Sequence, residues 1–259
     1  MFLQQLVNGI MLGSVYSLIA IGYTLVFGVL NLLHLAHGEV FMAGAFIGLY
    51  IMLFWKVPFI VGLLGAMAGA GLIGILIELI AFRPLPKGRP LAPLITTIGV
   101  AIILQQLSSR IFGGEQKVFP ESFEIVSYNL GPAAVTNLQL FILANALILM
   151  VLLHLLINKT KIGKAMRAVA ENTSIARALG VNVSRIISFT FFVASALAGA
   201  AGVLVGMIYS AVSPYMGVTM GLKGLVIMLL GGLGNVPGAM VGGLLLGVVE
   251  VMSVAYLAS

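Results

Sequence analysis

Apolar residues run through this chain in long blocks that short polar segments separate. A helix needs roughly 20 apolar residues to cross the hydrocarbon core of a bilayer, and most of the blocks approach that length. One block is too short to span alone, so broken or re-entrant helices are expected beside complete ones. The expected membrane segments are residues 6–30, 40–54, 58–82, 91–112, 138–157, 186–209, 222–230 and 239–257. The pattern predicts an all-α fold, a polytopic transmembrane helical bundle of about eight segments, in one transmembrane domain over residues 1–259.

Composition supports the bilayer as the solvent. Hydrophobic residues make up 61% of the chain, charged residues only 8%, and the mean hydropathy is +1.19, whereas a soluble domain has about 25% charged residues. With no cysteine, disulfides and cysteine-ligated metals are excluded. The net charge of +6 does not indicate a nucleic-acid partner, because the basic residues cluster in two short segments.

The longest polar stretch covers residues 158–185, and we call it the polar island. It holds six basic residues and one acid, Glu171, and the loop at 83–89 holds three more basic residues, which together make nine of the thirteen Lys and Arg. The segment at 113–137 carries three glutamates against Lys117 and lies between the basic segments, with one membrane block on each side. Because basic loops stay in the cytoplasm, we expect both basic segments there and the N-terminus outside.

The polar island has the residue order of a short capped helix. Residues 172–174, Asn-Thr-Ser, are types that satisfy the free N–H groups at a helix start. A short helix is then predicted at 175–179, and Gly180 is its expected left-handed stop. Asn182 or Ser184 is expected to start the next membrane helix.

This short helix would present Ile175, Ala176 and Leu179 as a small apolar face among positive charges. One interpretation is a docking surface for another protein. The other is an ordinary solvated basic loop on the cytoplasmic side, and the residues alone leave both open.

Two breaks interrupt the apolar blocks, one in each half of the chain, at 31–39 and 231–238. Irregular backbone at membrane depth is tolerated only where it is buried in protein or lines a wet cavity. Paired interruptions in two halves indicate a translocation path built from an internal inverted repeat. The candidate path residues are Asn31, His37, Gly38, Glu39, Gly231, Gly232, Gly234, Asn235 and Gly238.

Ionisable residues inside membrane segments are functional candidates. His34 and His37 lie three apart beside Glu39, and they either form a metal site or proton relay, or cap broken helix ends. Two histidines and one carboxylate lack a fourth ligand, so no metal site is predicted. Glu78 is expected to snorkel or to pair with Arg83 near a cytoplasmic helix end, with a proton-carrier role as the alternative.

Glu250 has no nearby cation in the sequence, so it either faces a cavity or marks an interfacial end. No catalytic residue is assigned anywhere. The chain lacks a G-x-x-x-x-G-K-[ST] phosphate loop and an H-E-x-x-H zinc motif, and no Ser/His/Asp set is recognisable by spacing. An intramembrane enzyme remains open as a reading, because such enzymes hide their catalytic residues.

Three motifs in order resemble a known family. The pattern Arg167-Ala168-x-x-x-Asn172-x-x-x-Ala176-x-x-x-Gly180 resembles the coupling-helix loop of ABC importer permeases. The stretch NLLHLAHGE at 31–39, followed by Met-Ala-Gly-Ala at 42–45, and the stretch GGLGNVPGA at 231–239 resemble the two signatures of branched-chain amino acid permeases. The resemblance covers essentially the whole chain.

The resemblance implies a permease subunit in the inner membrane of a bacterium or archaeon that carries branched-chain or related amino acids into the cytoplasm. Its partners would be membrane lipid, a second permease subunit in a heterodimer or homodimer, two ATP-binding subunits and an extracytoplasmic binding protein. ATP and Mg²⁺ would sit on the partners, with no cofactor in this chain. The coupling-loop residues would contact the ATPase. Family members usually continue with another hydrophobic segment, whereas this chain stops at Ser259.

Two other readings stay open. Permeases for urea or short amides belong to the same family. An ion-coupled secondary carrier would use His37, Glu39, Glu78 or Glu250 as coupling groups, but it has no need for a capped cytoplasmic helix.

Overall fold

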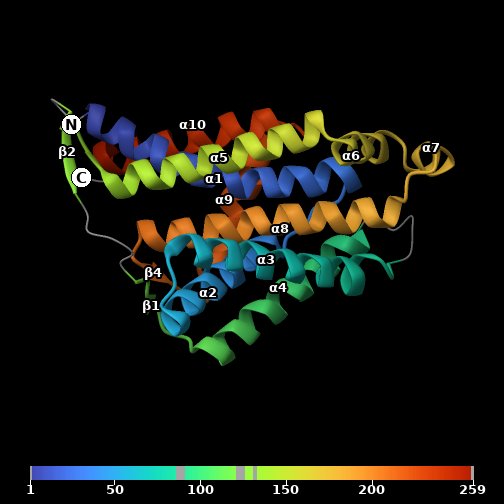
Figure 1. Ribbon diagram of the computed structural model, residues 1–259, viewed down its shortest axis with the longest axis horizontal. Coiled ribbons are helices and arrows are strands. Elements are labelled where there is room, and N and C mark those ends of the chain that lie inside the picture. Colours follow the sequence, from blue (N-terminus) through green and yellow to red (C-terminus); the bar gives the residue numbers. More distant parts are fainter. Residues whose placement is uncertain (1, 86–90, 121–125, 131–132, 258–259) are drawn as a thin grey trace.

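Long helices lie side by side along the longest dimension of the molecule in the computed structural model, which describes residues 2–85, 91–120, 126–130 and 133–257 (Figure 1). The helices are α1 (Phe2–Leu30), α2 (His37–Trp55), α3 (Phe59–Ile77) with a π-helical end η1 (Glu78–Phe82), α4 (Leu91–Phe112), α5 (Asn137–Lys159), α6 (Lys161–Glu171), α7 (Thr173–Ala178), α8 (Val183–Ile208), α9 (Met216–Gly231) and α10 (Val236–Leu257). Seven helices in the described ranges are long and apolar enough to cross a membrane, and α9 is a shorter apolar helix. The predicted all-α bundle of eight membrane segments is therefore confirmed.

Arg83 and the polar island lie at one end of the bundle, which we call the basic end. α6 and α7 project there, and the N-terminus, the C-terminus and β2 lie at the opposite end (Figure 1). Arg83 contacts Ser188 near the start of α8, which places the end of η1 at the basic end. Lys87 and Arg89 lie outside the described residues, as do Glu121 and Glu124. The shared side of the basic segments is thus confirmed for Arg83 and the polar island.

The segment between α4 and α5 forms strands that the hydropathy pattern did not predict. β2 (Ser127–Leu130) pairs antiparallel with β3 (Ala133–Thr136), and β1 (Lys117–Val118) pairs with β4 (Ala211–Val212), which follows α8. Thr136 then begins α5 with a capping box, because its side chain accepts from the Gln139 N–H and Gln139 bonds back to the Thr136 N–H.

Two helices begin inside the bundle, and their N-termini meet. The ring of His37 at the start of α2 packs against the ring of Tyr23, with centroids 4.6 Å apart. Tyr23 lies seven residues before the end of α1, about 10 Å inside it at 1.5 Å per residue. Gly38 in α2 packs against Gly217 and Gly221 in the first turns of α9. From this junction α2 runs to the end opposite the basic end, and α9 runs to the basic end.

This arrangement is that of an internal inverted repeat. α1 runs toward the basic end, a loop at 31–36 turns back into the bundle, and α2 starts there. α8 runs away from the basic end, a loop at 209–215 turns back, and α9 starts there. α1 packs along α10, and α3 packs along α8. The first helix of each half therefore packs against the third helix of the other half. The predicted repeat is therefore seen, but its second inward loop is at 209–215 and not at 231–238.

Small residues allow the α1–α10 contact to be close. A Cβ on Gly13 would lie 2.7 Å from the Leu244 Cα, which shows that the two backbones touch. Ser17 on the same face of α1 donates from its hydroxyl to the Met240 carbonyl oxygen at 2.7 Å. Close backbone approach through glycine is the usual packing device of membrane helices.

Candidate functional site

The polar island folds as two short helices, with the predicted cap and stop residues at the ends of the second one. The Asn172 side-chain oxygen accepts from the N–H groups of Ser174 and Ile175, both at 3.0 Å, and so caps α7. Gly180 has φ of +83°, the left-handed conformation that favours glycine. The Asn182 side chain accepts from the Arg185 N–H at 3.2 Å and starts α8. The predicted short helix is confirmed as α7.

Two of the three residues expected on the exposed face of α7 are on it. Ile175 is 59% exposed and Leu179 is 77% exposed, whereas Ala176 is 1% exposed. The prediction that Ala176 belongs to the exposed apolar face is therefore wrong. Its carbonyl accepts from the Val181 N–H at 3.0 Å, so this small residue lies where α7 turns back toward α8.

The remaining coupling-loop candidates hold the island together. Arg167 on α6 donates from its guanidinium to the Ile157 carbonyl oxygen near the end of α5. The Ala168 carbonyl accepts from the Asn172 N–H at 3.1 Å and closes the last turn of α6. These contacts set the angle between α5, α6 and α7, and they leave Ile175 and Leu179 as the apolar side chains that α7 offers to solvent.

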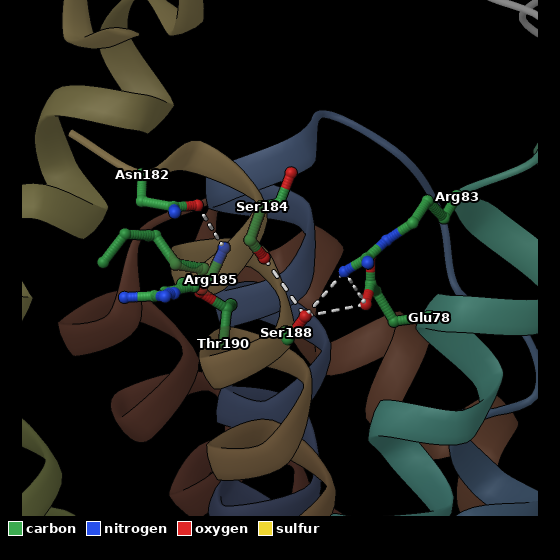
Figure 2. Close-up of polar contacts among 8 residues, drawn as sticks. Glu78, Arg83, Asn182, Ser184, Arg185, Ser188 and Thr190 are labelled. Carbon is green, nitrogen blue, oxygen red and sulfur yellow. Dashed lines mark hydrogen bonds and ion pairs between the residues drawn. The ribbon is translucent and has the colours of Figure 1, made fainter. Parts of the chain in front are cut away.

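An ion pair at the end of η1 is joined to α8 just inside the polar island (Figure 2). Arg83 donates to both Glu78 carboxylate oxygens at 3.1 and 3.0 Å, and the Ser188 hydroxyl donates to Glu78 at 2.8 Å. The Glu78 side chain is 4% exposed and that of Arg83 is 46% exposed. The predicted pairing of Glu78 with Arg83 is confirmed.

The π-helical turn η1 sits between this ion pair and a cluster of buried rings. The Arg83 N–H bonds to the Glu78 carbonyl at 2.8 Å, the five-residue spacing of a π-turn. Phe82, at the end of the same turn, packs against His34 with ring centroids 5.4 Å apart, and Phe191 of α8 lies equally close to His34. The turn therefore links the basic end to the loop at 31–36.

The two histidines do not cap helix ends. His34 and His37 are 1% and 0% exposed, and none of their ring nitrogens has a hydrogen-bond partner among the described residues. The residue that precedes α2 as its cap is Ala36, without a side-chain hydrogen bond. The interpretation of the imidazoles as caps is therefore wrong. Among the described residues, no three potential ligands lie close enough to hold a metal ion.

The junction of α2 and α9 is built from backbone and one carboxylate. A Cβ on Gly217 would lie 2.6 Å from the Glu39 Oε2 atom, and a Cβ on Gly38 would lie 2.7 Å from the Gly221 Cα. Glu39 is 3% exposed and its Oε2 has no described partner. A carboxylate is stabilised here by the positive ends of both helix dipoles. Asn31, with φ of +54°, is exposed at the end of α1.

The second break is a tight turn at the basic end. Gly232 and Gly234 have φ of +93° and +77°, and a Cβ on Gly234 would come within 3.3 Å of the Gly28 Cα near the end of α1. The Asn235 side chain accepts from the Gly238 N–H at 3.2 Å, which caps the start of α10. Gly231 packs against the Gly238 backbone. The structure thus brings neither end of this break into the α2–α9 junction, and the path role of both breaks stays a prediction.

The polar contact that the sequence did not reveal joins Tyr16, Lys223 and Glu250. The Lys223 ammonium lies 2.6 Å from a Glu250 carboxylate oxygen and 2.7 Å from the Tyr16 hydroxyl. The cation missing near Glu250 in sequence is therefore supplied by α9. A lysine in the middle of an apolar block was the available signal, but pairing it with α10 requires the fold.

Comparison with known proteins covers nearly the whole chain. A family model described as branched-chain amino acid transport system, permease component, matches residues 5–259. The high-affinity branched-chain amino acid transport system permease protein LivH of Escherichia coli K12 is 38% identical over 270 residues, which covers 100% of this chain and 88% of that relative.

Two other organisms have similar proteins. The corresponding BraD protein of Pseudomonas aeruginosa is 39% identical over 96% of this chain and 85% of its own length. A probable branched-chain amino acid permease of Methanocaldococcus jannaschii is 29% identical over 97% of this chain and 81% of its own length. No solved structure matches.

Proposed function

The chain belongs to the branched-chain amino acid permease family, and from this premise we propose that it forms the membrane path of an ABC importer for leucine, isoleucine, valine or a related amino acid. The proposed direction is into the cytoplasm, and the proposed energy source is ATP hydrolysed by separate subunits. The basic end then faces the cytoplasm, as the excess of Lys and Arg there indicates.

The observation that carries this proposal is the exposed apolar face of α7. The side chains of Ile175 and Leu179 are exposed at the tip of the bundle, although they are large and apolar. Arg177, between them in sequence, is exposed as well. An apolar surface surrounded by positive charges is more favourable in a groove of another protein than in water. We assign the partner as the ATP-binding subunit, with α7 seated in its surface.

Rigid contacts lead from α7 into the membrane. α7 is joined to α8 by two residues beyond Gly180, and Asn182 caps the start of α8. Ser188, one and a half turns further along, bonds Glu78, and η1 carries Phe82 against His34. A displacement of α7 by the ATPase therefore reaches the loop at 31–36 through packed and bonded groups. Transport requires that the ATPase bind the two states of this network with different affinity.

The remaining partners follow from the same proposal. A second permease subunit, homologous or identical, completes the path, two ATP-binding subunits bind at the basic end with Mg²⁺ and ATP, and an extracytoplasmic binding protein delivers the substrate at the opposite end. Membrane lipid covers the exposed apolar faces of helices such as α4 and α5, whose side chains in the described residues are largely unburied. No cofactor is proposed for this chain.

Uptake by reconstituted transporter tests the proposal. The chain is purified with the subunits that accompany it and placed in vesicles, with the binding protein outside and ATP inside. We expect leucine accumulation that needs internal ATP and persists with a protonophore. Accumulation that needs a proton gradient and ignores ATP would replace the proposal with an ion-coupled carrier. Urea uptake without leucine uptake would change the substrate and keep the importer.

A further inference from the structure

A charged pair lies near the middle of the bundle, and its side chains are partly exposed at the surface. Lys223 of α9 and Glu250 of α10 form an ion pair of 2.6 Å, and their side chains are 26% and 30% exposed. Tyr16 bonds both partners through its hydroxyl, at 2.7 and 3.2 Å. Tyr16 is midway along α1, and its ring underlies the ammonium, whose distance to the ring centroid is 4.9 Å.

The exposure distinguishes this pair from the other charged side chains in the described membrane helices. Glu39 and Glu78 are buried. The remaining charges of these helices lie within a few residues of a helix end, as in Arg110, Lys159 and Arg185. A charge at the bilayer centre is costly in lipid and is found facing a bundle interior or a water-filled cavity. The face of α9 and α10 at this pair therefore borders water or protein in the assembled transporter.

We propose that Lys223 and Glu250 form an intramembrane site for a zwitterionic α-amino acid, an assignment that rests on the proposed function. The Lys223 ammonium binds the substrate carboxylate, and the Glu250 carboxylate binds the substrate ammonium. The bound state replaces one internal ion pair with two, and the net charge of the site stays zero throughout. Tyr16 keeps the ammonium of Lys223 oriented toward the open side while its partner changes.

The neighbours of the pair suit an aliphatic side chain. Val226 and Val254, each one helical turn from one of the charged residues, are 44% and 64% exposed on the same faces of the two helices. Apolar contact of this kind favours leucine or valine over polar amino acids of equal charge. The internal ion pair competes with the substrate, so affinity at this site is weak, as a transient stop in a path requires.

Cysteine accessibility tests whether the pair borders water. The chain has no cysteine of its own, so each substituted cysteine is a single reporter. In the assembled transporter we expect Glu250→Cys to react rapidly with a membrane-impermeant, charged thiosulfonate reagent. The matched control is Ile103→Cys, 64% exposed in the middle of α4 and expected in lipid, which should not react. Equal protection of both positions would mean that lipid or the second permease subunit covers the pair, and it would overturn the proposal.

A double substitution separates a substrate site from a structural ion pair. Replacing such a pair with apolar residues of similar volume is often neutral for folding. Lys223→Met with Glu250→Met is therefore expected to insert and assemble, while leucine uptake per assembled transporter falls at least about tenfold, the factor for loss of one charged contact. Uptake restored to the unsubstituted rate in this double variant, with either single variant impaired, would assign the pair to structure alone.

These outcomes are distinguishable from failure of the proposed function. If the unsubstituted transporter accumulates no leucine with ATP, the function itself is wrong. If it does accumulate leucine while Glu250→Cys is unreactive, or while the double variant transports normally, only the site is wrong.

Discussion

Removing one partner of the Glu78–Arg83 pair is expected to destabilise the chain far more than removing both. In Arg83→Met, the buried Glu78 carboxylate keeps one donor, the Ser188 hydroxyl, and loses two charged hydrogen bonds of 3.1 and 3.0 Å. Leaving one member of a fully buried pair costs about 3–5 kcal/mol. Because the Arg83 side chain is 46% exposed, water replaces part of the loss, and we expect about 2–3 kcal/mol.

Two further variants make the reasoning specific. Ser188→Ala removes the hydroxyl that donates to Glu78 and accepts from Arg83, and it leaves the ion pair, so a loss of about 1.5 kcal/mol is expected. Glu78→Leu with Arg83→Met removes both charges and fills the site with apolar atoms, so stability should return to within about 1 kcal/mol of the unsubstituted chain. The free energy of unfolding is measured for the purified chain in detergent, by denaturant titration followed through helical circular dichroism.

The ranking decides the outcome. We expect the order of loss to be Arg83→Met, then Ser188→Ala, then the double variant. If the double variant is as unstable as Arg83→Met, the loss comes from the changed shape of the side chains at η1. An unpaired carboxylate charge would then not be its cause. Equal stability of all three variants would show that water reaches the Glu78 carboxylate.

Five more substitutions have defined outcomes. Gly38→Ala should abolish uptake and lower stability by at least about 2 kcal/mol, because its Cβ meets the α9 backbone. The control is Gly99→Ala in α4, where a Cβ meets nothing within 4 Å. Its thermal unfolding temperature should equal or exceed that of the unsubstituted chain. Asn172→Leu and Gly180→Val should leave the chain inserted but uncouple ATP hydrolysis from uptake, as measured together in vesicles; normal coupling would refute the role of α7. Thr136→Ala should cost about 1 kcal/mol in denaturant unfolding through loss of its cap on α5, and no loss would mean that β3 alone orders this helix start.

Features that depend on a few neighbouring residues were predictable from sequence. Asn172, Gly180 and Asn182 act within three residues of their own positions, so their cap and stop roles follow from residue type. Glu78 and Arg83 lie five residues apart near a helix end, and their pairing needed only that closeness. The membrane segments follow from length and hydropathy, which act on each segment separately.

Features that depend on packing between distant segments were not predictable in the same way. Lys223 and Glu250 are 27 residues apart and meet across two helices that run in opposite directions. The burial of Ala176 depends on which side of a six-residue helix turns toward α8, and no periodicity in so short a segment decides that. The start of α2 inside the bundle depends on the contact of Gly38 with Gly217. A glycine in the sequence indicates a close approach of two segments, but it does not show which segment is the partner.

The separation of the driving contact from the proposed substrate site has a structural consequence. In the proposed mechanism the ATPase moves α7 and with it α8, which packs along α2 and α3, whereas Lys223 lies on α9 and Glu250 on α10. The α2–α9 junction is a direct contact between these two groups of helices, and it is built from glycine backbone and the Glu39 carboxylate. Such a contact lets α9 follow α2 by sliding, and the turn at 231–238, with two glycines at positive φ, lets α9 pivot against α10. A shift of α7 can therefore change the Lys223–Glu250 separation without unpacking the tight α1–α10 seam, which is how a distant ATPase would open a site that it never touches.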